Sequence, residues 1–115
     1  MRLEIPQNRI FRRVITVTDE DTEEDYRLKN EEKIIFGVKK VPGKRNPYVI
    51  KKELAEADYD ESTGGYILTL TSRDTNLPPG LYFCDAALKK ADGEFEPIIG
   101  KTEFEILSSV VSADE

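Results

Sequence analysis

The sequence contains no histidine and no tryptophan, and it contains a single cysteine, Cys84. Without histidine, the commonest general base and metal ligand at neutral pH is missing. One cysteine excludes an intramolecular disulfide and any metal site built from several cysteines. Cys84 falls on an inward-facing position of an alternating segment, so we expect an inert core thiol. No glycine-rich phosphate loop, nucleophile elbow or zinc spacing occurs either. The sequence therefore predicts a non-enzymatic protein with no cofactor and no bound metal.

Long hydrophobic runs are also missing. The longest apolar run, residues 34–38, is far too short to span a bilayer, and residues 1–11 do not resemble a signal peptide. With only one cysteine, this predicts a reducing, cytoplasmic compartment. The 17 basic and 23 acidic side chains give a net charge of −6. That charge disfavours binding to nucleic acid or to an anionic membrane surface.

The chain has room for one domain, because 115 residues support a single core. Hydrophobic residues make up 38% of the sequence and charged residues 35%, so the core must be thin. We expect one domain over residues 1–107 and a frayed or linking tail over residues 108–115.

Short segments alternate polar and apolar residues with a period of two, and turn signals separate them. Strands are expected in residues 9–17, 32–41, 48–52, 66–71, 81–89, 95–99 and 102–107. The third of these suits a sheet edge, residues 52–57 suit a strand end and loop, and Gly100 suits a bulge. Asp92-Gly93 is typical of a tight hairpin turn. About seven short strands predict an all-β, two-sheet antiparallel sandwich, with a small barrel as the competing arrangement.

The most distinctive stretch is residues 74–84, with the sequence D-T-N-L-P-P-G-L-Y-F-C. Its two prolines fix φ and remove donors, and its glycine permits a turn that other residues resist. In immunoglobulin-like sandwiches a tyrosine at this location, two residues before a cysteine, bonds its hydroxyl back to upstream backbone. The alternative is that a strand simply begins with tyrosine after a Pro-Gly turn. The residues of this predicted structural corner are Asp74, Thr75, Pro78, Pro79, Gly80 and Tyr82.

Residues 67–82 follow the order I-L-T-L-T-x-x-D-T-x-L-P-P-G-x-Y, which resembles the immunoglobulin-like domains of phage tail and baseplate proteins. These include the N-terminal domains of upper-baseplate proteins and receptor-binding-protein adaptors from phages and prophages of Gram-positive bacteria. The similarity extends loosely over residues 9–107 and includes the closing G-x-x-x-F-x-I that begins at Gly100. The resemblance implies an immunoglobulin-like fold and a structural or adaptor role in a phage tail.

The same resemblance implies partners and a location. The partners would be other tail or baseplate proteins, or further copies of this chain. The protein would reside in the bacterial cytoplasm during assembly and then in the virion. The resemblance brings no catalytic residue with it.

Two charged features invite other interpretations. The acidic residues 19–25 suggest calcium binding. A helix-loop-helix calcium site would, however, need glycine in place of Glu24 and a bidentate glutamate in place of Asn30. Asp58-x-Asp60 fails similarly. We therefore expect a solvated loop.

A basic cluster surrounds Tyr48 and is expected to guard strand edges, to contact a partner or to complement the acidic loop of another subunit. The cluster consists of Lys39, Lys40, Lys44, Arg45, Lys51 and Lys52.

The alternative function is a carbohydrate- or surface-ligand-binding module. Exposed aromatic residues beside an acidic residue would favour it, for example Tyr48 and Tyr66 near Asp58. A hydrolase would need two carboxylates to converge in a pocket, drawn from Glu53, Asp58 and Asp60.

Overall fold

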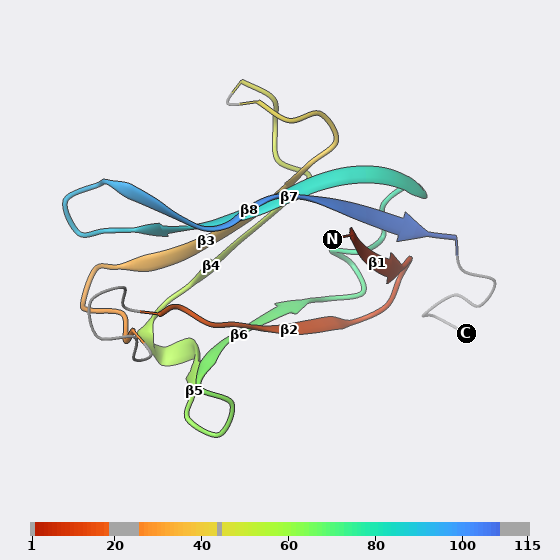
Figure 1. Cartoon of the computed structure of the whole chain (residues 1–115). Coiled ribbons are helices and arrows are strands. Elements are labelled where there is room, and N and C mark those ends of the chain that lie inside the picture. The colour runs from red at the N-terminus through yellow and green to blue at the C-terminus, as the bar shows by residue number, and fades with distance from the viewer. Residues whose placement is uncertain (1, 19–25, 44, 109–115) are drawn as a thin grey trace.

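The computed structural model describes residues 2–18, 26–43 and 45–108. Two β-sheets lie face to face (Figure 1). The larger sheet has the strand order β1-β8-β7-β3-β4, and the smaller has the order β2-β6-β5. One 3-10 helix, η1 (Glu56–Asp58), precedes β5. The all-β class and the two-sheet, sandwich-like arrangement agree with the sequence prediction.

The strands are short, with the exception of the last two. They are β1 (Arg2–Pro6), β2 (Phe11–Ile15), β3 (Lys33–Lys39), β4 (Ile50–Leu54), β5 (Tyr59–Asp60), β6 (Gly65–Leu70), β7 (Gly80–Lys89) and β8 (Phe95–Leu107). As expected, β4 is an edge strand. η1 occupies part of the segment that was expected to be strand end and loop.

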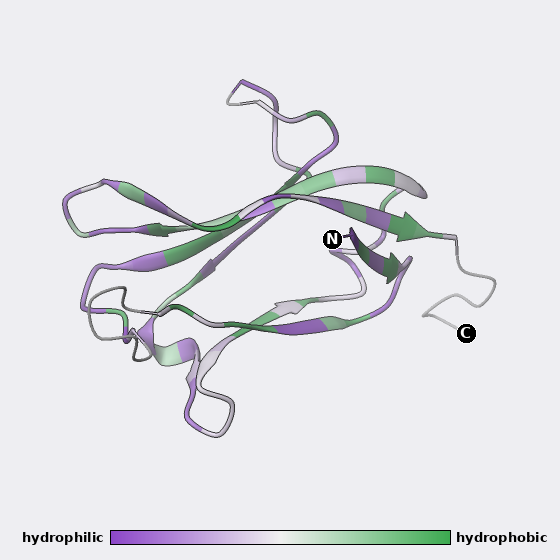
Figure 2. Ribbon diagram, in the orientation of Figure 1, coloured by the Kyte–Doolittle hydropathy of each residue, from purple (hydrophilic) through white to green (hydrophobic). Residues whose placement is uncertain are grey.

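The side chains that alternate inward fill the space between the sheets. Figure 2 shows hydrophobic and hydrophilic residues alternating along the strands of both layers. The five-stranded sheet contributes Ile5, Ile34, Phe36, Val38, Ile50, Leu54, Tyr82, Cys84, Ala86, Leu88, Phe104 and Ile106. The three-stranded sheet contributes Ile15, Tyr66, Leu68 and Leu70. The inward-facing position predicted for Cys84 on β7 is confirmed.

β1 was not predicted from the sequence; it pairs in parallel with β8 and places Ile5 opposite Ile106. The larger sheet is therefore mixed, and the prediction of a wholly antiparallel sandwich was wrong. Parallel strands are joined by long connections, so no local turn signal announces the pairing. Ile5 is fully buried, and Arg2 forms ion pairs with Glu103 and Glu105.

Residues 95–107 form one strand rather than the two that were expected. Two register shifts occur against β7, because Cys84 lies opposite Thr102 whereas Ala86 lies opposite Ile99 and Ala87 opposite Pro97. The first shift includes the predicted bulge at Gly100. A bulge bends a strand and increases its twist without ending the ladder, and this is what happens in β8.

Candidate functional site: the β6–β7 connection and an outer groove

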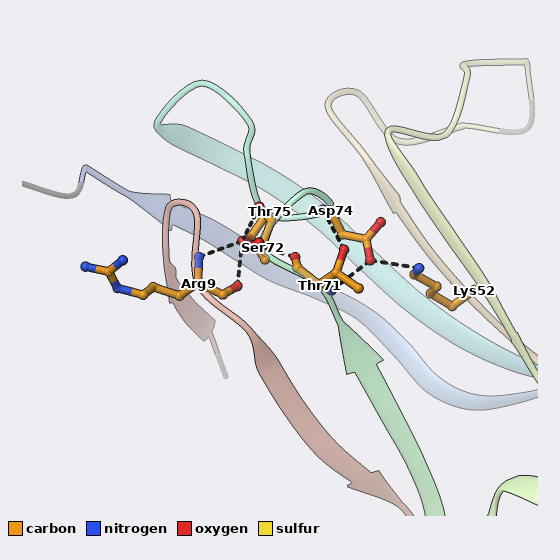
Figure 3. A network of polar contacts seen from close by, with 6 residues as sticks. All are labelled: Arg9, Lys52, Thr71, Ser72, Asp74 and Thr75. Atoms are coloured by element: carbon orange, nitrogen blue, oxygen red, sulfur yellow. Dashed lines mark hydrogen bonds and ion pairs between the residues drawn. The ribbon is translucent and has the colours of Figure 1, made fainter. Parts of the chain in front are cut away.

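The connection between β6 and β7 is held by its own side chains and by a lysine from β4 (Figure 3). Asp74 Oδ2 accepts a hydrogen bond from the backbone amide of Thr71 at 2.8 Å, and Thr71 Oγ1 accepts one from the backbone amide of Asp74 at 3.2 Å. Lys52 Nζ lies 2.7 Å from the same carboxylate oxygen. Burial raises the pKa of Asp74, but the hydrogen bonds from Lys52 and Thr71 outweigh it, so this pKa lies below its ordinary value of 3.8.

Thr75 fastens this connection to the one between β1 and β2. Its side chain is fully buried, and its Oγ1 donates a hydrogen bond to the carbonyl oxygen of Arg9 at 2.6 Å. The same oxygen accepts a hydrogen bond from the Arg9 amide at 3.0 Å. The backbone amide of Asn8, a residue with φ of +62°, donates to the Thr75 carbonyl oxygen at 3.4 Å. One hydroxyl group thus joins two loops that are far apart in the sequence.

Tyr82 makes the backbone hydrogen bond that was expected of it. Its hydroxyl donates to the carbonyl oxygen of Pro78 at 2.7 Å, and its side chain is 3% exposed. Burial raises the pKa of the Tyr82 hydroxyl. Gly80 has φ of +150°, a conformation that L side chains rarely adopt. Pro78 and Pro79 are exposed at the turn, and Lys40 Nζ lies 4.5 Å from the centroid of the Tyr82 ring.

The predicted corner residues are brought together, and the polar side chains among them, those of Asp74, Thr75 and Tyr82, are engaged in hydrogen bonds. Their hydrogen bonds close one loop and tie it to neighbouring segments. Other residues that bond to this connection or to the start of β7 were not predicted with it, namely Gln7, Arg9, Lys40 and Lys52. The two lysines belonged to the basic cluster, whereas Gln7 and Arg9 had no local signal.

Cys84 is a buried thiol, as the sequence predicted. It is 3% exposed. Burial, with a smaller contribution from the adjacent Asp85, raises the pKa of the Cys84 thiol to about 11, although Arg13 acts in the opposite direction. A protonated, enclosed thiol is a poor nucleophile.

The carboxylates considered for hydrolysis or metal binding each have a partner of their own, and for Glu53 this is Lys33, whose Nζ lies 3.8 Å from Oε2. Asp58 accepts a hydrogen bond from the backbone amide of Ala55, and Asp60 accepts one from the Ser62 hydroxyl at 3.0 Å. Glu53 lies on edge strand β4. Within residues 2–18, 26–43 and 45–108, no three histidine, cysteine or carboxylate side chains group into a metal site. The acidic residues 19–25 lie outside the described residues.

The suggested pairing of Tyr48 with Tyr66 is wrong. Tyr66 is fully buried, and its hydroxyl accepts a hydrogen bond from the backbone amide of Leu28 at 2.6 Å. Tyr48 is 47% exposed and packs over Gly37 of the other sheet. Tyr66 shares the inward face of β6 with Leu68, so it cannot contribute to an exposed platform.

A groove of about 360 Å³ lies on the outer face of the five-stranded sheet. It lies beside the connection between β3 and β4, which projects away from the three-stranded sheet in Figure 1. No group of residues in the sequence predicted it, although Tyr48 stood out as an aromatic residue among lysines. Its lining residues are Gly37, Lys39, Pro42, Gly43, Tyr48, Phe83, Cys84, Asp85 and Lys101.

In the described part of the chain, no helix is both long enough and apolar enough to cross a membrane. Comparison with known protein families and with curated protein sequences gives no match to this chain.

Proposed function

We propose that this chain is a non-enzymatic structural or adaptor component of a phage or prophage tail, acting through protein–protein assembly in the baseplate. One observation carries the proposal. Residues 67–82, which hold the resemblance to tail proteins, contain both ends of the Tyr82–Pro78 hydrogen bond. A tyrosine tied to upstream backbone at the start of a strand is a feature of immunoglobulin-like sandwiches. The two-sheet arrangement also supports an immunoglobulin-like fold, because such domains consist of two packed sheets.

The sheet edges suggest where tail proteins would bind. The edge strand β4 carries Lys51, Lys52 and Glu53, and such charges discourage pairing with another strand. The edge strand β2 also carries charges, Arg12 and Arg13, but it adds exposed apolar side chains: Val14 on it is 38% exposed and Ile10 just before it is 62% exposed. We infer that the β2 edge contributes to assembly.

Two copies of this chain would not pair easily through β2. An antiparallel pair of β2 strands would bring the Arg12 and Arg13 cations of both copies together. A different tail protein with acidic side chains is the better partner for this edge. A stable contact would bury on the order of 1,200 Å² in total, and symmetry in a tail ring would repeat it on every subunit.

The test deletes the gene from the prophage that encodes it and examines the induced particles by electron microscopy. We expect particles with incomplete tails, which the wild-type gene should restore and a Val14→Glu variant should restore poorly. A Lys89→Glu variant, which alters an exposed residue at the end of β7, serves as the control. Complete, infective particles from the deletion strain would refute the structural role.

A second candidate function, the binding of a carbohydrate or other surface ligand, is favoured by the groove around Tyr48 and Phe83.

A further inference from the structure

The groove on the outer face of the five-stranded sheet is built into the backbone. Its base is Gly37 on β3, which lies opposite Asp85 on β7 and Lys51 on β4. A Cβ atom added at Gly37 would collide with the ring of Tyr48, so the missing side chain makes room for that ring. The volume of about 360 Å³ falls at the lower end of the range for small-molecule sites.

The segment that carries Tyr48 is fixed by hydrogen bonds of its own. Lys39 Nζ donates to the carbonyl oxygen of Gly43 at 2.6 Å, and Asn46 Nδ2 donates to that of Pro42 at 2.9 Å. These bonds favour one shape for the chain that leads to Tyr48. A preformed wall reduces the entropy that binding must overcome.

Cationic side chains gather around the two aromatic rings of the groove. The Nζ atoms of Lys39 and Lys51 lie 4.5 and 5.6 Å from the centroid of the Tyr48 ring, and Lys101 Nζ lies 5.7 Å from that of Phe83. Six ion pairs join other charged residues of the described segments, and none of them uses these three lysines. The groove is thus a locally positive region of a chain whose net charge is −6.

We propose that this groove binds a saccharide that carries one anionic group, either a carboxylate or a phosphate. The Tyr48 and Phe83 rings offer apolar surfaces for the C–H face of a sugar ring. The Asp85 carboxylate can accept hydrogen bonds from sugar hydroxyls, and the ammonium groups of Lys39 and Lys101 can bind the anionic group. This inference does not depend on the proposed tail function.

The surroundings disfavour two other anionic ligands. A nucleic-acid strand would bring several phosphates toward Asp85 and toward a negatively charged protein, and both repel it. An acidic peptide that adds to a sheet needs an unpaired strand edge. Gly37 offers none, because β3 is paired with β4 on one side and with β7 on the other.

The test titrates the full-length, ¹⁵N-labelled chain with three disaccharides and follows the backbone amide signals by NMR. The probes are cellobiouronic acid, cellobiose 6′-phosphate and uncharged cellobiose. We expect saturable shifts for the groove residues with at least one charged probe, and binding of cellobiose that is about tenfold weaker or worse. The better of the two charged probes identifies a carboxylate or a phosphate as the preferred group.

Two variants connect this binding to the groove. Lys101→Glu should weaken binding of the charged probe about tenfold or more, and Tyr48→Ala should weaken binding of all three probes. Lys89→Glu makes the same change of charge at an exposed site outside the groove and should bind as the wild type does. Thermal unfolding of each variant shows whether it is folded.

Three results would overturn the proposal. The first is the absence of saturable shifts with both charged disaccharides. The second is equal binding by wild type and a folded Lys101→Glu variant. The third is tighter binding of adenosine monophosphate or of a hexaglutamate peptide, titrated in the same way, which would assign the groove to a nucleotide or to an acidic peptide.

Discussion

The hydroxyl group of Thr75 exchanges two hydrogen bonds with the backbone of Arg9, donating to its carbonyl oxygen at 2.6 Å and accepting from its amide at 3.0 Å. The two residues are 66 positions apart in the sequence. Thr75 is fully buried, so water cannot replace these bonds without opening the structure. This contact holds the β1–β2 connection against the β6–β7 connection. Each of these connections runs between the larger and the smaller sheet.

Replacing Thr75 with valine should destabilise the protein strongly. The variant keeps the shape of the side chain but deprives the Arg9 amide and carbonyl of the group that they bond, at a cost of about 1–3 kcal/mol. Thr75→Ser keeps the hydroxyl and should lose less. Urea unfolding of both variants measures the difference, and a serine variant that is less stable than the valine variant would contradict the role of the hydroxyl.

Removal of the Tyr82 hydroxyl should cost roughly 1 kcal/mol or more, because the Pro78 carbonyl oxygen would lose its partner. The matched control is Tyr59→Phe, since the Tyr59 side chain has ring contacts but its hydroxyl has no hydrogen bond to the described residues. The midpoint of urea unfolding should fall for Tyr82→Phe and remain almost unchanged for Tyr59→Phe. Equal midpoints for wild type and Tyr82→Phe would show that the Tyr82–Pro78 hydrogen bond does not stabilise the fold.

Cys84 should resist modification in the folded protein. It is 3% exposed, and burial raises the pKa of its thiol to about 11, so little thiolate exists at pH 8. Labelling with Ellman's reagent should be slow in native buffer and fast in guanidinium chloride. Cys84→Ala should cost no more than about 1–2 kcal/mol. Rapid labelling of the native protein would contradict the enclosed position of the thiol.

Local patterns predicted much of this fold. The alternation in β7 placed Cys84 on the inward face correctly, because a period of two follows from strand geometry alone. The Tyr82–Pro78 bond spans four residues, so the turn residues between them could indicate it. The hairpin at Asp92-Gly93 was predictable for the same reason.

Contacts between distant segments were not predictable. β1 pairs with β8 across about a hundred residues, and neither strand encodes which partner it will meet. Thr75 has no sequence feature that directs it to Arg9. The groove likewise depends on the register that places Gly37 opposite Asp85 and on the loop that brings Tyr48 over it. Such relationships arise from the assembled sheets.

The ion pair between Asp74 and Lys52 should make stability depend on pH in the acidic range. The pKa of Asp74 is below 3.8 in the folded protein, so its ionised form stabilises the fold above about pH 4, and this contribution is lost as the pH falls through the lowered pKa. Asp74→Asn removes the contribution and should cost about 1 kcal/mol at neutral pH, since the pair is partly exposed. The difference in unfolding free energy between wild type and variant, measured with urea, should be constant from about pH 5 to 8 and should shrink toward about pH 2. Lys52→Ala should reduce the effect of the Asp74 substitution when the two are combined, because they remove the same interaction. A difference that stays constant down to about pH 2 would show that the charge of Asp74 does not contribute to holding the β6–β7 connection against β4.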